Sequence, residues 1–126
     1  MNVYVPTFQE YAKNVQLELE QLVDRAGTLA LTLGDVNGRH IVLMFDSYMA
    51  YRKLDEGDAL LTLSAMGKSG GTGKYFYRVD NSDFYAWFNA ERCDTGHGQP
   101  LVHYVVAAIN DIVDVLSLEP PTIKVS

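Results

Sequence analysis

Two apolar runs on either side of Asn37-Gly38 predict a β-hairpin in this part of the chain. Leucines alternate with smaller or polar residues over residues 29–33, which is the period of a strand with one buried face. Asn-Gly is a strong signal for a two-residue type I′ turn, and that turn would place Val42 opposite Leu33. Residues 40–45 are almost continuously apolar. They predict a strand in the middle of a sheet that is covered on both faces.

Two segments have the period of amphipathic helices. Residues 7–26 begin with a capping box at Thr7 and continue with apolar residues at helical spacing. Residues 47–54 carry apolar side chains three positions apart, which predicts a first short helix. Asp58, after a break at Gly57, is placed to cap a second helix that extends to residue 66.

The second half of the chain contains strand signals and one short helix. Residues 74–79 read as a strand, and Ser82 is placed to cap a short helix with an aromatic face. The apolar spacing of residues 101–117 fits one helix, whereas their many β-branched residues fit two strands that meet at Asn110-Asp111. We favour the strands. A last strand is expected over residues 122–125.

Length and composition agree with one globular unit. The chain has 126 residues, of which 48% are hydrophobic and 21% are charged. A chain of this length buries enough surface to form a core without metal ions or disulfide bonds. With the elements above, the sequence predicts a single α+β domain over residues 1–126, with a mainly antiparallel β-sheet packed against helices.

Charge and cysteine content bear on the cellular compartment and on the class of partner. The net charge of −6 disfavours direct binding to nucleic-acid phosphates and suits a basic protein partner, although the same charge also serves solubility alone. Cys93 is the only cysteine, which suits a reducing compartment. We find no secretory signal and no apolar run of membrane-spanning length, so we expect a cytoplasmic protein without membrane contact.

The glycine-rich segment at residues 67–74 does not form a phosphate-binding loop. Such a loop requires Gly-x-x-x-x-Gly-Lys-Ser/Thr before a helix. Lys68 stands where the first glycine is needed, and Tyr75 stands where the magnesium-binding hydroxyl is needed. The segment is better explained as a loop between two elements.

Cys93, His97 and His103 offer possible metal ligands or a Cys–His nucleophile. The Cys-x3-His spacing is not that of a standard zinc site, and no second close pair completes four ligands. We therefore expect His103 to be a hydrogen-bonded structural residue. The sequence predicts no cofactor, no metal and no enzymatic activity.

Acidic and aromatic residues provide the better candidates for a function. The carboxylates near Gly57 either face solvent or meet a basic partner. The aromatic residues of the middle third either line the core or, for two or three of them, lie exposed, where tyrosine and tryptophan often anchor interfaces. We predict a partner-binding surface that contains Asp55, Glu56, Asp58, Tyr85 and Trp87.

Three parts of the chain resemble small immunity proteins of bacterial contact-dependent growth inhibition and other polymorphic toxin systems. They are residues 45–51 with 55–58, residues 77–88, and residues 103–104 with 111–117 and Pro120-Pro121. The resemblance implies a protein that binds a cognate toxin domain inside the producing cell and occludes its active site. It implies no particular functional residues.

Two other functions stay open. One is a small acidic secretion chaperone, a homodimer that holds an unfolded segment of an effector. The other is a small enzyme that uses Cys93 with His97 or His103.

Overall fold

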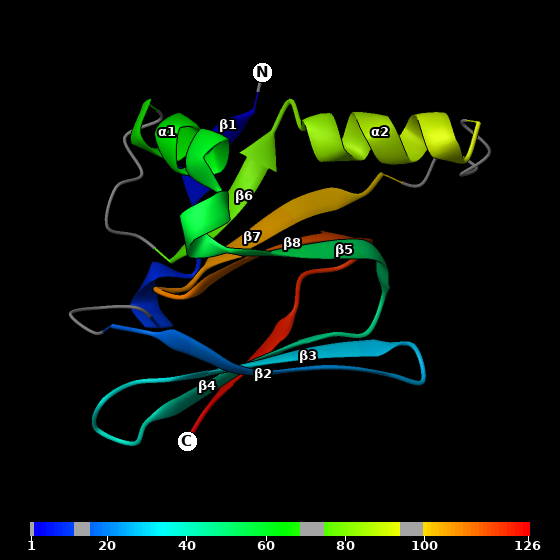
Figure 1. Ribbon diagram of the computed structural model, residues 1–126. Coiled ribbons are helices and arrows are strands. Elements are labelled where there is room, and N and C mark those ends of the chain that lie inside the picture. The colour runs from blue at the N-terminus through cyan, green and yellow to red at the C-terminus, as the bar shows by residue number, and fades with distance from the viewer. Residues whose placement is uncertain (1, 12–15, 69–74, 94–99) are drawn as a thin grey trace.

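Two antiparallel β-sheets that pack face to face form the framework of the protein (Figure 1). The computed structural model describes residues 2–11, 16–68, 75–93 and 100–126. Across the larger sheet the strands are β1 (Val3–Pro6), β6 (Phe76–Asp80), β7 (Val102–Ala107), β8 (Asp111–Ser117) and β5 (Tyr48–Asp55), in that order. Across the smaller sheet they are β2 (Glu18–Arg25), β3 (Thr28–Gly34), β4 (His40–Phe45) and β9 (Thr122–Val125). Every pair of neighbouring strands is antiparallel.

The main core lies between the two sheets. Its most buried members include Leu29, Leu31 and Leu33 of β3, Ile41, Leu43 and Phe45 of β4, and Val113 and Val115 of β8, each at most 1% exposed. Burying a side chain of this size stabilises a fold by about 1.5–3 kcal/mol relative to leaving it exposed. Alternation along β3 and β4 places all six of their side chains on one face of the smaller sheet, and this face meets the larger sheet.

The residues that alternate with the core positions of the larger sheet meet two short helices (Figure 1). The 3-10 turn η2 (Glu56–Asp58) leads into α1 (Leu60–Lys68), whose Met66 lies in a buried cluster with Tyr77 and Ile112. In α2 (Asp83–Glu91), Phe84 lies in a buried cluster with Leu116. The α+β class and the mainly antiparallel pairing are therefore confirmed. Each helix has nine residues, and the described part of the chain contains no helix with the length and hydropathy needed to cross a bilayer.

The helix predicted over residues 7–26 is wrong. The described parts of this segment form the 3-10 turn η1 (Gln9–Tyr11) and the strand β2. A β-bulge between Leu19 and Gln21 adds one residue to β2 opposite β3. Because of this extra residue, Leu19 and Leu22 pair with leucines of β3 that face the core, although they are three positions apart. A spacing of three is typical of a helix face, so the bulged strand imitates a helix in the sequence.

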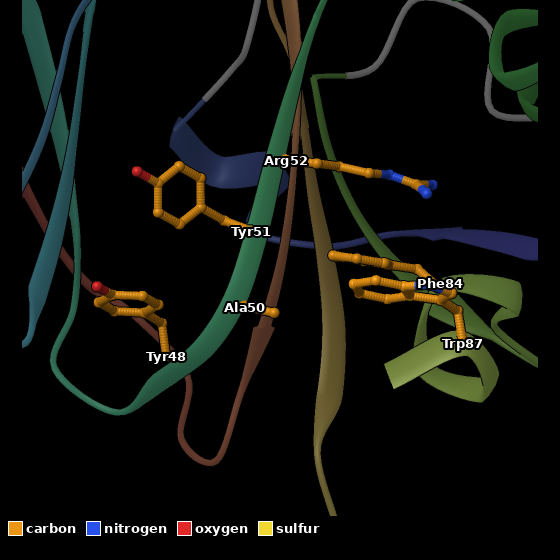
Figure 2. A pocket seen from close by; sticks show the side chains of 6 residues that line it. All are labelled: Tyr48, Ala50, Tyr51, Arg52, Phe84 and Trp87. Atoms are coloured by element: carbon orange, nitrogen blue, oxygen red, sulfur yellow. The ribbon is translucent and has the colours of Figure 1, made fainter. Parts of the chain in front are cut away.

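The short helix predicted over residues 47–54 is wrong for the same reason. This segment is strand β5, and its ladder with β8 is shifted by one residue between Tyr48 and Ala50. The extra residue puts Tyr48 and Tyr51 on the same face of the strand (Figure 2). The helix expected next does form as α1, but Asp58 lies in η2 and does not cap it.

The predicted hairpin forms, but its turn and register differ from the prediction. Leu33 pairs with Ile41 rather than Val42, because the loop has five residues instead of two. Asp35 organises this loop, since its carboxylate accepts hydrogen bonds from the backbone N–H groups of Asn37 at 2.8 Å and Arg39 at 3.0 Å. Strand β4 lies between β3 and β9, as expected for an inner strand, but only one of its faces is buried.

The elements of the second half agree with the sequence, whereas strand β1 was not predicted. Strands β6 and β9 form, and residues 101–117 form the two strands β7 and β8 instead of a helix. Ser82 is the N-cap of α2, where its Oγ accepts a hydrogen bond of 2.9 Å from the backbone N–H of Tyr85. Most of the glycine-rich segment, residues 69–74, lies outside the described residues.

Candidate protein-binding site

An open cavity of about 380 Å³ lies along strand β5. It is lined by Tyr48, Ala50, Tyr51, Arg52, Phe84 and Trp87. In Figure 2, Tyr48 and Tyr51 project from one face of β5, and Ala50 and Arg52 project from the other, toward α2. Because side chains on both faces of one strand border the same cavity, the cavity extends across the outer edge of that strand.

Strand β5 is an edge strand of the larger sheet. It pairs with β8 on one side, and no described strand pairs with its other side. An edge strand presents unpaired backbone N–H and C=O groups along its free side, and another extended chain can bind there. Apolar Met49 and Leu54 are 46% and 39% exposed on this strand. The free edge of β5 therefore combines unpaired backbone groups with exposed apolar side chains.

Two tyrosines form the wall of the cavity that faces the smaller sheet. Their rings meet edge to face, with centroids 5.7 Å apart. The hydroxyl of Tyr48 donates to one carboxylate oxygen of Asp24 in β2, and the hydroxyl of Tyr51 donates to the other at 3.3 Å. The hydrogen bond to Asp24 raises the pKa of Tyr48, and burial followed by the charge of Asp24 raises the pKa of Tyr51. Both rings are thus held in place by one carboxylate of the opposite sheet.

Helix α2 supplies the other wall. The rings of Phe84 and Trp87 are stacked at 5.7 Å with an interplanar angle of 16°. The guanidinium of Arg52 lies over the Phe84 ring, 4.4 Å from its centroid, where it gains a cation–π attraction. Phe84 is 4% exposed and anchors the stack, whereas Trp87 is 54% exposed. The tryptophan therefore presents its apolar surface to solvent from a fixed position.

A buried network of polar side chains lies between helix α2 and strands β7 and β8. His103 Nε2 is 2.7 Å from Asp114 Oδ1, and His103 Nδ1 is 2.7 Å from Ser82 Oγ. The second carboxylate oxygen of Asp114 accepts from Arg52 Nε at 3.0 Å. This polar network therefore links the N-cap of α2, through β7 and β8, to the cavity residue Arg52.

Ser82, His103 and Asp114 have the composition of a hydrolase triad, but their geometry favours a structural role. The side chain of His103 has no exposed surface, and the Phe84 ring lies across it at 5.5 Å. Ser82 Oγ is engaged at the start of α2. The expectation that His103 is a hydrogen-bonded structural residue is confirmed. Asp114 was missed, although a carboxylate within an apolar strand signals a buried partner.

The predicted partner-binding residues fall into two groups. Trp87 lines the cavity, whereas the Tyr85 hydroxyl accepts a hydrogen bond from the backbone N–H of Leu101 at 2.9 Å. Asp55, Glu56 and Asp58 lie at the far end of β5, where the Asp55 carboxylate accepts from the N–H of Gly57 at 2.8 Å. Arg52, the lining residue nearest to Asp55 in sequence, is three positions away, which is roughly 10 Å along a strand.

The structure adds Arg52 and Phe84 to the candidate site, and no sequence signal placed them beside each other. Cys93 is exposed at the end of α2, and its possible partner His97 lies outside the described residues. No group of three or more His, Cys, Asp or Glu residues able to hold a metal ion occurs within the ranges that the structure describes.

Comparison with known proteins identifies no relative, since no family model, no curated protein and no solved structure matches the chain. The function is therefore inferred from the cavity and the strand edge.

Proposed function

We propose that this protein binds a cognate toxin domain inside the cell and occludes its active site, using the cavity along β5 as the centre of the interface. The observation that carries the proposal is this apolar cavity, which crosses a free strand edge and contains the half-exposed Trp87. Occlusion requires affinity and shape but no catalytic group.

The residue types around the cavity support binding to a protein. Tryptophan, tyrosine and arginine are the residues most enriched at the energetic centres of protein interfaces. Here Trp87, Tyr48 and Arg52 are each held by an internal contact: a ring stack, a hydrogen bond and an ion pair. Side chains that are already fixed lose little conformational entropy on binding.

The charge of the chain supports a basic partner. A net charge of −6 attracts a positively charged protein over long range and repels nucleic-acid phosphates. Toxin domains that act on nucleic acids have to carry basic surfaces to contact the phosphates of their substrates. The resemblance to immunity proteins and this charge argument thus agree on the class of partner.

The test is capture from the native cell followed by a toxicity assay. The tagged protein is purified, the bound proteins are identified by mass spectrometry, and the C-terminal domain of a stoichiometric partner is expressed alone. We expect that domain to stop growth and that co-expression of this protein restores growth. A Trp87→Ala variant should lose both capture and protection, whereas Val36→Ala, which changes a 90% exposed apolar residue in the β3–β4 loop, should keep both. The proposal fails if no partner is captured, if the partner is harmless, or if Trp87→Ala protects fully.

The free edge of β5 also supports the secretion-chaperone alternative, because two copies of an edge strand can pair in a homodimer. Sedimentation at physiological salt separates the two functions. A stable dimer that dissociates when β5 is altered would favour the chaperone, and a monomer would exclude it.

A further inference from the structure

We propose that the partner contributes an extended segment that adds to the larger sheet as a strand antiparallel to β5. This segment carries a basic residue opposite Asp55 and, five positions later, a large apolar residue opposite Ala50. The inference rests on the proposed function and specifies how the partner binds.

The first argument is the shape of the site. The cavity is bordered from both faces of β5, so its occupant lies in the plane of the sheet beyond the strand edge (Figure 2). An extended chain fits this position because its backbone pairs with the edge while its side chains alternate to the two faces. Every ladder already present is antiparallel, and antiparallel pairing is slightly the more stable per residue.

The second argument is the distribution of charge along the strand. Arg52 and Lys53 are the basic residues of β5, and each pairs at 3.0 Å with a carboxylate of the neighbouring strand, Asp114 and Asp111 respectively. In contrast, Asp55, Glu56 and Asp58 have no ion pair with any described residue. Within residues 48–58 the uncompensated charge is therefore negative and lies at the C-terminal end of β5. An antiparallel partner strand meets that end with its N-terminal part, which places the basic residue first.

The third argument is the side-chain register. Residues directly opposite each other in an antiparallel pair project to the same face. Ala50 projects toward α2, and its small side chain leaves space beside Trp87 (Figure 2). The partner residue opposite Ala50 therefore packs on the stacked rings of Phe84 and Trp87. This position follows the one opposite Asp55 by five residues, since antiparallel strands count in opposite directions.

A second copy of this chain is a poorer occupant. Its net charge of −6 repels an identical molecule. In the one antiparallel register that pairs Met49 with Leu54, Asp55 of each copy would lie opposite Tyr48 of the other, so both acidic ends would lack a basic partner.

The test uses a short acetylated and amidated peptide, Lys-Thr-Val-Thr-Val-Phe-Thr-Ser, titrated into the isotope-labelled full-length protein and followed by nuclear magnetic resonance. We expect shift changes of backbone amides in β5 and of the Trp87 indole, with slower hydrogen exchange along β5. Exchanging the Lys and Phe positions should abolish these changes. Trp87→Ala should weaken the dissociation constant about tenfold or more, as for a central anchor residue.

Charge variants test the register. Asp55→Lys should weaken the peptide about two- to fivefold, the range of an exposed ion pair, and a peptide with Glu in place of Lys should restore the affinity. Glu18→Lys makes the same charge change in β2, an edge strand of the other sheet, and should have no effect. The inference is overturned if the peptide causes no chemical-shift changes, or if the changes are confined to another edge strand. It is also overturned if β5 is already paired in a self-associated protein.

This result is separable from the proposed function. If the peptide does not bind but the protein neutralises a toxin in a Trp87-dependent way, strand addition is refuted and the proposed function stands. Binding of the peptide by a protein that captures no toxin would refute the proposed function alone.

Discussion

Replacing Asp114 with alanine tests how much the polar network of Ser82, His103, Asp114 and Arg52 stabilises the fold. The Asp114 carboxylate is 1% exposed and accepts hydrogen bonds from two groups, the ring N–H of His103 and the guanidinium of Arg52. Removing it leaves the His103 donor buried and unpaired, which costs about 1–3 kcal/mol. The Arg52 side chain is 45% exposed, so losing its ion pair adds about 1 kcal/mol or less. We expect the free energy of unfolding to fall by about 1–4 kcal/mol in total.

Urea unfolding followed by circular dichroism measures this loss. With a slope of about 2 kcal/mol per molar urea, the midpoint should fall by about 0.5–2 M at unchanged slope. Asp114→Asn should cost less, because its side-chain oxygen still accepts from His103, and it keeps the comparison measurable if the alanine variant does not fold. Asp111→Ala is the matched control, since it removes a carboxylate of the same strand that pairs with Lys53 at 3.0 Å. If Asp114→Ala is no more destabilising than Asp111→Ala, the polar network contributes no more to stability than the ion pair of Asp111 with Lys53.

Three further predictions address the cap, a loop and alkaline pH. Ser82→Ala should lower the free energy of unfolding by about 1.5–5 kcal/mol, because it removes the N-cap of α2 and leaves His103 Nδ1 without its partner, whereas Ser82→Thr should lower it much less in the same urea assay. Gly38 has φ of 82°, so Gly38→Ala should lower the melting temperature through a backbone cost of about 1–2 kcal/mol, and an unchanged melting temperature would contradict that assignment. Burial raises the pKa of Tyr104 above its usual value near 10, so the folded state keeps a proton that the unfolded state loses. The free energy of unfolding should therefore be constant with respect to Tyr104 below pH 10 and fall as the pH rises beyond it, and Tyr104→Phe should make that fall shallower.

Local chemistry made several elements predictable. Ser82 was identified as a cap because its hydroxyl can accept from a backbone N–H at the start of a helix, and it does so in α2. The β-branched residues between 101 and 117 indicated strands because they pack well on a pleated surface. Trp87 was predicted as part of a partner-binding surface, and its side chain on α2 is 54% exposed.

The candidate site was less predictable, because its residues come from two elements that meet only in the folded chain. Arg52 and Phe84 are far apart in sequence, and their contact depends on how β5 and α2 lie on the same sheet. Asp55 and Trp87 were predicted as parts of one surface, yet Trp87 lines the cavity and Asp55 lies at the C-terminal end of β5, beyond the lining residues.

What the sequence alone determined is the α+β class, the hairpin around Gly38 and the strands and helix of the second half, because these depend on the residues within each segment. Only the tertiary structure decided that the segments around Leu19 and Tyr48 are strands. Each contains one extra residue relative to its partner strand, and that residue shifts the apolar spacing from two to three. A bulge is defined by the strand opposite, so no pattern within the bulged strand distinguishes it from a helix. The same long-range pairing left β5 at the edge of its sheet, and this position opens the cavity beside Trp87.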